Sequence, residues 1–443
     1  MWARLARFWR SSGLTPTIVR ISSGSAVLHL VNMAVGLITG MVLSRLLGAK
    51  GLGEYGIAMA TASFLGIPIE AGMAQLIIRD TAKANRMTPE IVGMVRNAVG
   101  NALVVASVIA VAVLVYDKMW ASPAVPLLLS VAFAVASSWT NIVAAPVLGV
   151  QKVVAGQIAP LAVRPIAFLL VLCSLLISGS VASPVVVMFF QVGSAGISLA
   201  FGLYQFFLLV RTTHKSNEKM ATPVSHRALW RESLPIAAVG ASHVLLGNGP
   251  IAALGMVATA ESVGLYRVAT STLTMVMLPL TLLNAVAVPV LARTHASGDV
   301  RATQSALRQF AIGMTTGVAV LAAPAFAAGE PLLDLLFGLG FGRAAPELRV
   351  LIVGALVNAF FGANVAILTM AGRAKVVARA FAVGVIVLGT SLPPLVSRFD
   401  SMGAAVASTL AMTVWNVIVW IEAHIALGVD TSLLGMWGRQ ERP

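Results

Sequence analysis

The chain has 443 residues, of which 58% are hydrophobic and only 10% are charged, with a formal net charge of +14. Its mean hydropathy is +0.92. A soluble core needs a polar shell, and this chain has too few charged residues to build one, so the composition excludes an ordinary soluble domain and favours a membrane protein. The single cysteine, Cys173, excludes an intramolecular disulfide.

The first 23 residues alternate aromatic and basic side chains, as in Phe8, Trp9 and Arg10. At helical spacing this pattern gives one aromatic and one basic face, which suits the headgroup plane of an anionic leaflet. A disordered basic tail is the alternative. No small-residue cleavage site precedes the first apolar run, so we expect no secretory signal.

Twelve segments are long and apolar enough to cross a bilayer, which takes about 20 residues per helix. They lie near residues 24–47, 55–78, 97–116, 123–148, 156–178, 184–210, 232–257, 263–291, 309–329, 346–371, 376–396 and 401–427. Lipid offers the backbone no hydrogen bonds, and these runs lack the polar alternation of a β-barrel. The sequence therefore predicts an all-α polytopic membrane protein.

The two halves of the chain resemble each other. Residues 53–58 (GEYGIA) are followed 211 positions later by residues 264–269 (GLYRVA), and residues 149–155 are echoed 223 positions later by residues 372–378. Two separate echoes at about half the chain length indicate a duplicated unit. Six spans per half make both repeats enter the membrane in the same direction, which predicts two parallel six-helix lobes.

Basic residues set the expected orientation. With a cytoplasmic N-terminus, 22 of the 30 Lys and Arg residues fall on the inner side and 7 on the outer side. The positive-inside rule then places both termini in the cytoplasm. We divide the chain into an interfacial basic and aromatic segment (1–23), an N-lobe (24–210), a cytoplasmic linker (211–231), a C-lobe (232–427) and a cytoplasmic tail (428–443).

Several motifs carry a resemblance to a known family. In chain order they are residues 44–48 (SRLLG) with 53–56 (GEYG), 70–72 (EAG) with 77–79 (IIR), 329–338 (GEPLLDLLFG) with 344–346 (AAP), and 402–407 (MGAAVA). Together they span nearly the whole chain. In this order they resemble the polysaccharide flippases of the multidrug/oligosaccharidyl-lipid/polysaccharide export superfamily.

The resemblance implies a transporter with two six-helix lobes around a central cavity. Such a protein moves undecaprenyl-diphosphate-linked oligosaccharides from the inner to the outer leaflet of the bacterial inner membrane, for O-antigen, capsule or exopolysaccharide synthesis. The implied partners are this lipid-linked substrate, membrane lipids, and the polysaccharide polymerase and chain-length machinery, without nucleic acid. The related peptidoglycan-precursor flippases usually carry two further spans, which argues against lipid II as the substrate.

Glu70 is an acid well inside a predicted span. A carboxylate in the membrane is costly, so it is by default a functional candidate. We expect Glu70, with Arg79 from the same motif, to carry a proton or sodium ion coupled to transport. A structural pair between Glu70 and Arg79 is the alternative. We expect no cofactor and no metal site, because no converging ligands occur at suitable spacing.

Three arginines are candidates for the anionic substrate. Arg164 lies within the fifth predicted span beside Pro165, and its planar guanidinium can bind a diphosphate through two oxygens at once. Snorkelling toward the inner headgroups is the alternative role. Arg45 and Arg267 are expected at the outer ends of their spans, where they would receive the diphosphate or anchor the protein at the interface.

Four polar residues in the first and seventh spans are candidates for binding sugar hydroxyls. They are His29, Asn32, His243 and Asn248. Hydrogen bonding between helices explains the same residues equally well.

Glycine and proline mark possible hinges in the same two spans. They are Gly36, Gly40, Gly247, Gly249 and Pro250. Proline removes a backbone donor and glycine lowers the cost of bending, so both helices are expected to be interrupted here. Matching interruptions in two halves indicate the substrate site of a transporter.

Two other functions fit parts of the sequence. A cation-coupled drug antiporter of the same superfamily would have the same spans, but would favour acids in its cavity. A membrane polysaccharide polymerase or glycosyltransferase would act on similar substrates, but needs acids, bases or an Arg-rich loop on the outer side. The longest outer segment offers only Glu330, Asp334 and Arg343. No phosphate-binding loop motif occurs, so we expect no ATP hydrolysis.

Overall fold

The computed structural model describes residues 16–120, 124–179, 182–213 and 226–436. Parts of the expected segment 1–23, linker 211–231 and tail 428–443 lie outside the described residues. The first half contains α2 (Pro16–Glu70), α3 (Met73–Ala84), α4 (Pro89–Trp120), α5 (Ala124–Gly149), α6 (Val153–Ile158), η1 (Ala159–Val163), α7 (Arg164–Ile177) and α8 (Pro184–Thr213). The second half contains α9 (His226–Val257), α10 (Ala260–Val276), α11 (Leu278–Ala296), α12 (Val300–Ala327), α13 (Gly329–Phe337), η2 (Phe341–Ala344), α14 (Ala345–Phe360), α15 (Asn364–Met370), α16 (Ala374–Leu427) and η3 (Leu433–Met436).

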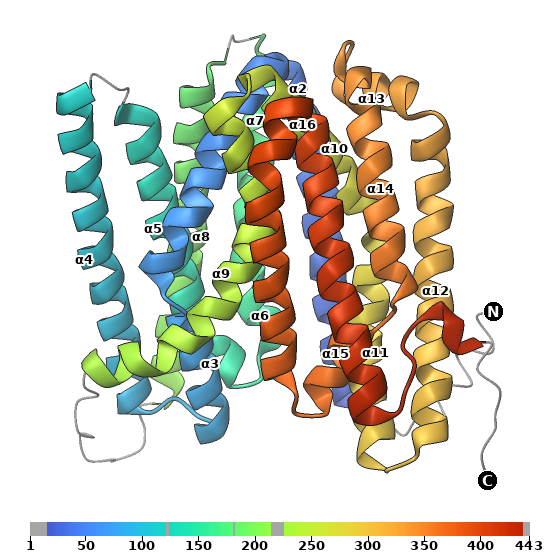
Figure 1. The fold of residues 1–443 in the computed structure, drawn as a ribbon. Coiled ribbons are helices and arrows are strands. Elements are labelled where there is room, and N and C mark those ends of the chain that lie inside the picture. The colour runs from blue at the N-terminus through green and yellow to red at the C-terminus, as the bar shows by residue number, and fades with distance from the viewer. Residues whose placement is uncertain (1–15, 121–123, 180–181, 214–225, 437–443) are drawn as a thin grey trace.

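The protein is an all-helical polytopic membrane protein, as the composition predicts (Figure 1). Among the described residues, eight helices are long and apolar enough to cross a membrane, or up to ten if each of two bent helix pairs is one span. The pairs are α10 with α11, bent by 46°, and α14 with α15, bent by 40°. The two longest helices, α2 and α16, each contain one non-helical residue, Gly48 and Asp400.

Helix ends follow local sequence signals. Thr259 accepts a hydrogen bond from the Ser262 amide at the start of α10, and Asp299 does the same for the Ala302 amide at the start of α12. These side chains satisfy amide groups that have no partner within the helix. At the end of α16, Gly428 adopts φ 65°, a left-handed cap that glycine takes at no steric cost.

The predicted interruptions of the first and seventh spans are not breaks in the helices. In α2 the chain stays helical through Gly36 and Gly40, and the non-helical residue is Gly48, eight positions after Gly40. Helix α9 runs continuously through residues 247–250. Pro250 sits inside the helix, because one missing amide does not end a helix that neighbouring helices support.

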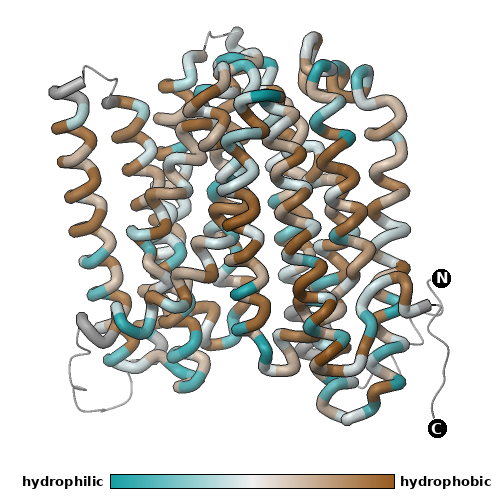
Figure 2. The backbone as a smooth tube through the Cα atoms, viewed as in Figure 1, coloured by the Kyte–Doolittle hydropathy of each residue, from teal (hydrophilic) through white to brown (hydrophobic). Residues whose placement is uncertain are grey.

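The middle of the molecule presents apolar side chains outward. Figure 2 shows hydrophobic residues along the middle of the helices and more hydrophilic residues at the two ends. Val104, Phe189 and Ile386 are 64%, 65% and 63% exposed, although each is large and apolar. In water such a surface would be unfavourable, whereas in a bilayer it contacts hydrocarbon.

The two halves are joined by a close contact between α2 and α10. A β-carbon added to Gly53 would overlap the carbonyl oxygen of Ala260, and one added to Gly264 would overlap the carbonyl oxygen of Ala49. Each helix therefore contributes two small residues to the contact, an alanine and a glycine four positions later. Such spacing lets helix backbones approach closely within a membrane.

This contact is reciprocal, and it uses the offset seen in the sequence. Ala49 and Ala260 are 211 positions apart, and so are Gly53 and Gly264. Each half therefore presents the same two small residues to the other half. The sequence echo at residues 53–58 and 264–269 is thus explained by packing, since both copies form one symmetric helix crossing.

Gly53→Ala and Gly264→Ala are expected to destabilise the protein to a similar extent, because each added methyl group overlaps a backbone carbonyl that cannot rotate away. Overpacking of this kind costs about 1–3 kcal/mol. The apparent melting temperature of the detergent-solubilised protein measures the effect. Gly100→Ala is the matched control, because no atom lies within 4 Å of a β-carbon at this position in α4. Equal melting temperatures for Gly53→Ala and Gly100→Ala would show that the crossing does not hold the halves together.

Candidate functional site

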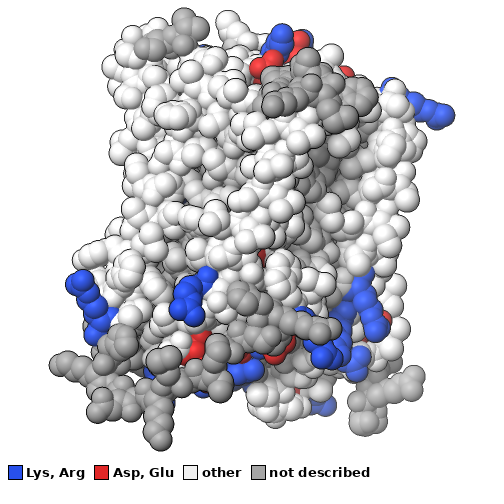
Figure 3. All heavy atoms as spheres, turned by 90° about the vertical axis from the view of Figure 1, so that its left-hand side faces the viewer, with Lys and Arg blue, Asp and Glu red and all other residues white. Residues whose placement is uncertain are grey.

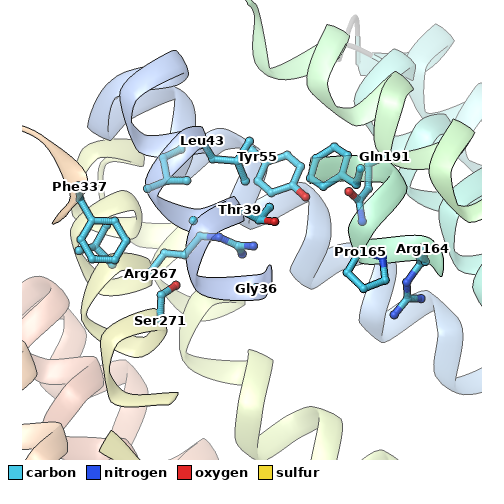
Figure 4. Close-up of a pocket in the computed structure, with 14 residues that line it drawn as sticks. Gly36, Thr39, Leu43, Tyr55, Arg164, Pro165, Gln191, Arg267, Ser271 and Phe337 are labelled. Atoms are coloured by element: carbon cyan, nitrogen blue, oxygen red, sulfur yellow. The ribbon is translucent and has the colours of Figure 1, made fainter. Parts of the chain in front are cut away.

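A cavity of about 210 Å³ lies between the two halves of the chain. It is bounded by α2, α7 and α8 from the first half and by α10 and α13 from the second half (Figure 4). Its lining residues are Gly36, Thr39, Gly40, Leu43, Leu52, Tyr55, Arg164, Pro165, Phe168, Gln191, Arg267, Val268, Ser271 and Phe337. Two predicted arginines and two predicted glycines thus meet at one place.

Arg164 reaches the cavity from a distorted part of the fifth span. Pro165 has no amide hydrogen and its ring clashes with the carbonyl four residues earlier, which a regular α-helix cannot accommodate. The five residues before Arg164 form a turn of π-helix, and the Arg164 amide bonds to the Ala159 carbonyl, five positions back. Such turns occur frequently at functional sites. Arg164 therefore lies within the fifth span, at a point where the helix is locally widened.

The Arg164 guanidinium is held by neutral groups. Its Nη1 donates to the Ser137 hydroxyl at 3.2 Å, and its Cζ lies 5.7 Å from the centre of the Phe133 ring. Both partners come from α5. A cation over an aromatic face is attracted by the ring, but the ring does not neutralise its charge.

Arg267 enters the same cavity from the other half. Its Cζ lies 5.1 Å from the centre of the Tyr55 ring. In the repeat, Arg267 corresponds to Gly56, and a β-carbon on Gly56 would lie 3.2 Å from the Arg267 Cδ. The missing side chain in the first half thus leaves room for the arginine of the second half. Figure 4 shows the Arg267 guanidinium beside Thr39 and pointing into the cavity.

Neither cavity arginine takes part in any ion pair found among the described residues. Two unneutralised guanidinium groups therefore face one partly buried space. Bringing charges out of water is costly unless an opposite charge compensates them. The cavity is electrostatically suited to an anion and poorly suited to a cation.

Arg45 does not line this cavity. Its side chain is exposed, and its Nη2 donates to the Leu335 carbonyl at 3.1 Å. The neighbouring Ser44 hydroxyl donates to the Phe337 carbonyl at 2.7 Å. These bonds fasten the end of the first span to α13. In the 211-residue repeat Arg267 corresponds to Gly56, so Arg45 and Arg267 are not at equivalent positions.

Glu70 and Arg79 are not paired with each other. The Glu70 Oε2 accepts a hydrogen bond from the Asn141 side chain at 2.8 Å. Arg79 instead contacts the Asp80 carboxylate at 2.7 Å and the Glu232 carboxylate at 2.6 Å. Hydrogen bonds to Asp80 and then Glu232 raise the pKa of Arg79 above its usual value. The left-handed Ala71 and Gly72, with φ of 47° and 70°, separate α2 from α3 and so carry Arg79 away from Glu70.

The four candidate sugar-binding residues lie outside this cavity. His243 is exposed on α9, and its ring centre lies 4.7 Å from that of Phe381. Asn32 and His243 are separated by the repeat offset of 211 positions. His29 and Asn248 are partly buried. Among the described residues, none of the four is hydrogen-bonded to a cavity arginine, so the cavity alone gives them no role.

Three polar residues of the cavity were not predicted from the sequence, namely Thr39, Gln191 and Ser271. Single polar residues within apolar runs are common in membrane helices, where they join helices, so nothing in the sequence distinguished these three. Glu347, which was also not predicted, is only 6% exposed and accepts a hydrogen bond from the Ser401 hydroxyl at 2.6 Å. Glu347 lies in the first turn of α14, and its bond to Ser401 joins α14 to α16 directly after the non-helical Asp400.

No group of three or more His, Cys, Asp and Glu side chains that could hold a metal ion occurs in the described parts of the chain. The polar groups of the cavity are arginines, an amide and hydroxyls, which suit an anionic or hydroxyl-bearing ligand.

Solved structures share this fold at low sequence identity. The lipid II flippase MurJ in an inward closed conformation aligns with a TM-score of 0.69 and 11% identity, over 90% of this chain and 86% of that chain. An outward-facing multidrug resistance MATE transporter aligns with a TM-score of 0.61 and 16% identity, over 93% and 95%. A MOP superfamily transporter from Pyrococcus furiosus aligns with a TM-score of 0.60 and 13% identity, over 93% and 95%.

Comparison with family descriptions gives a more specific result. No curated protein matches the chain. Residues 21–295 match the family described as "Polysaccharide biosynthesis protein", which is more than half of the chain. The chain therefore belongs to the polysaccharide biosynthesis protein family.

Proposed function

We propose that this protein is a secondary transporter that moves undecaprenyl-diphosphate-linked oligosaccharides from the inner to the outer leaflet. The products would serve O-antigen, capsule or exopolysaccharide synthesis. One observation carries the proposal: Arg164 and Arg267, one from each half, face a single cavity without a carboxylate partner. A diphosphate is the anion that such a pair suits, because each guanidinium can bind two of its oxygens.

The same proposal includes twelve spans in two parallel lobes, residues 24–210 and 232–427. Eight helices support it, because each is long enough to span a membrane. Dividing α2 at Gly48 and α16 at Asp400 adds two spans, and the two bent pairs add two more, which gives twelve. Basic side chains gather at the lower end of the face in Figure 3. This distribution favours an inner membrane protein whose two termini are cytoplasmic.

The proposed mechanism is alternating access. The lobes rock about their contact while the diphosphate stays between the arginines, and Gly36 and Gly247 absorb part of the bending. Both glycines are open on the side where a β-carbon would point, with no atom within 4 Å. Glu70, bonded to neutral Asn141 rather than to a cation, would bind a proton or sodium ion during the cycle. Polysaccharide polymerase and chain-length proteins would act on the delivered substrate.

A drug antiporter is the second candidate, since a MATE transporter has the same fold. Cationic drugs would be repelled by the two cavity arginines. A membrane polymerase or glycosyltransferase is a weaker candidate, because the cavity contains neither an acid nor a histidine for proton transfer.

Replacement of Arg164 tests the proposed function. Arg164→Ala should lower transfer of a lipid-linked oligosaccharide by about 10–100-fold, as expected for loss of hydrogen bonds to a charged group. Arg164→Lys keeps the charge without the planar fork, so it should retain partial activity. Leaflet transfer in reconstituted vesicles is the measurement. Arg349→Ala serves as the control, because Arg349 is only partly buried, lies outside the cavity and donates to the Phe326 carbonyl. Normal transfer by Arg164→Ala would refute the proposed diphosphate site.

Glu70→Gln tests ion coupling. The amide keeps the size of the side chain but cannot bind a proton or sodium ion, so transport driven by an ion gradient should fall at least tenfold, while substrate binding stays unchanged. Transport is measured in vesicles with and without imposed proton and sodium gradients. Glu422→Gln, near the end of α16, is the control. If Glu70→Gln retains gradient-dependent transport, Glu70 has only a structural role.

Cysteine labelling tests the proposed orientation. In a Cys173→Ala background, Ser183→Cys should react with an impermeant maleimide added outside intact cells, and Ser297→Cys should not. Both serines are exposed, at the start of α8 and the end of α11. Labelling is compared before and after permeabilisation, which should expose Ser297→Cys. Outside labelling of Ser297→Cys in intact cells would contradict the orientation.

A further inference from the structure

Two polar atoms in the cavity have no hydrogen-bond partner although both are buried. They are the Thr39 hydroxyl oxygen and the Gln191 Oε1. Both residues line the cavity with the arginines. Burying a polar group without a partner costs about 1–3 kcal/mol, so a ligand that supplies the hydrogen-bond partners would be stabilised at these two atoms. Gln191 in α8 and Thr39 in α2 therefore mark a second polar surface of the same site.

A diphosphate alone does not complete this surface. At neutral pH its exposed oxygens mainly accept hydrogen bonds, and the arginines already supply donors. The Gln191 carbonyl oxygen accepts, so it needs a ligand that donates. A hydroxyl both donates and accepts, and can therefore satisfy the Gln191 amide and the Thr39 hydroxyl together. The ligand part next to the diphosphate should thus carry hydroxyl groups.

These residues line one small cavity together with the two arginines. Figure 4 shows Thr39 between the Arg267 guanidinium and Gln191, with Arg164 beyond Pro165 on the Gln191 side. Ser271 follows Arg267 by one helical turn, so both lie on the same face of α10. The cavity volume of about 210 Å³ is below the roughly 300–1,000 Å³ that encloses a drug-sized ligand. It is thus suited to the linkage and the adjoining ring, while a longer oligosaccharide would extend beyond it.

We propose that Thr39, Gln191 and Ser271 form a subsite that recognises the first sugar of the substrate, next to the diphosphate. The inference rests on the proposed flippase function and adds a specificity determinant to it. A site that hydrogen-bonds a hydroxyl discriminates strongly against a ligand that lacks it, because its own polar groups are then left unpaired. The subsite would therefore select substrates by their first sugar, whereas the arginines would bind any diphosphate linkage.

The experiment compares probes with and without the sugar. Binding of farnesyl diphosphate, and of farnesyl diphosphate linked to glucose, galactose or N-acetylglucosamine, is measured by calorimetry on the full-length protein in nanodiscs. The wild-type protein should bind at least one sugar-bearing probe more tightly than farnesyl diphosphate. Thr39→Val and Gln191→Leu should each remove roughly tenfold of that affinity and leave binding of farnesyl diphosphate unchanged.

Matched variants guard against folding effects. Thr39→Ser keeps the hydroxyl and should retain the preference for the sugar-bearing probe. Thr315→Val removes another buried hydroxyl that has no partner, on α12 and outside the cavity, and should change neither affinity. Melting temperatures confirm that each variant is folded.

The outcomes separate this inference from the proposed function. If Thr39→Val and Gln191→Leu leave the sugar preference intact, or weaken farnesyl diphosphate equally, the subsite is refuted while the diphosphate site stands. If Arg164→Ala leaves binding of every probe unchanged, or no probe binds to the wild-type protein, the proposed function fails and the subsite fails with it.

Discussion

The arrangement of the protein depends on the reciprocal contact between α2 and α10. At this crossing, Gly53 packs against the Ala260 backbone and Gly264 packs against the Ala49 backbone. Bilayer lipids are as apolar as the side chains, so close packing of backbones, rather than hydrophobic burial, is what can hold two helices together there. The contact uses the same two small residues from each half.

The cavity is a consequence of this symmetry and of one departure from it. The repeat places Tyr55 and Tyr266 at equivalent positions, but Gly56 in the first half is replaced by Arg267 in the second half. The absence of a side chain at Gly56 makes room for Arg267, which then lies over the Tyr55 ring. The position of Arg164 in the cavity does not come from the repeat. It depends on the π-helical turn beside Pro165. A symmetric scaffold therefore carries an asymmetric pair of cations.

Polar contacts elsewhere hold the bends of the helices in place. Glu347 accepts a hydrogen bond from Ser401, and Asp400 accepts one from Ser262 near the crossing. Asp400 adopts φ 52°, which costs a non-glycine residue energy that surrounding contacts must supply. These bonds connect α10, α14 and α16 beside the contact between the halves. The second half is therefore braced where it meets the first.

The sequence by itself determined the membrane class and the helical content, because both depend on composition and on local runs of apolar residues. It also identified Arg164 and Arg267 as individual candidates, because a charged residue in an apolar run can be recognised from the sequence alone. Only the tertiary structure brought those two together with Thr39 and Gln191, and assigned Arg79 to Glu232 and Arg45 to the Leu335 carbonyl. The physical reason is that these partners lie on different helices, and a sequence records neither the rotation of a helix about its axis nor the neighbour it faces.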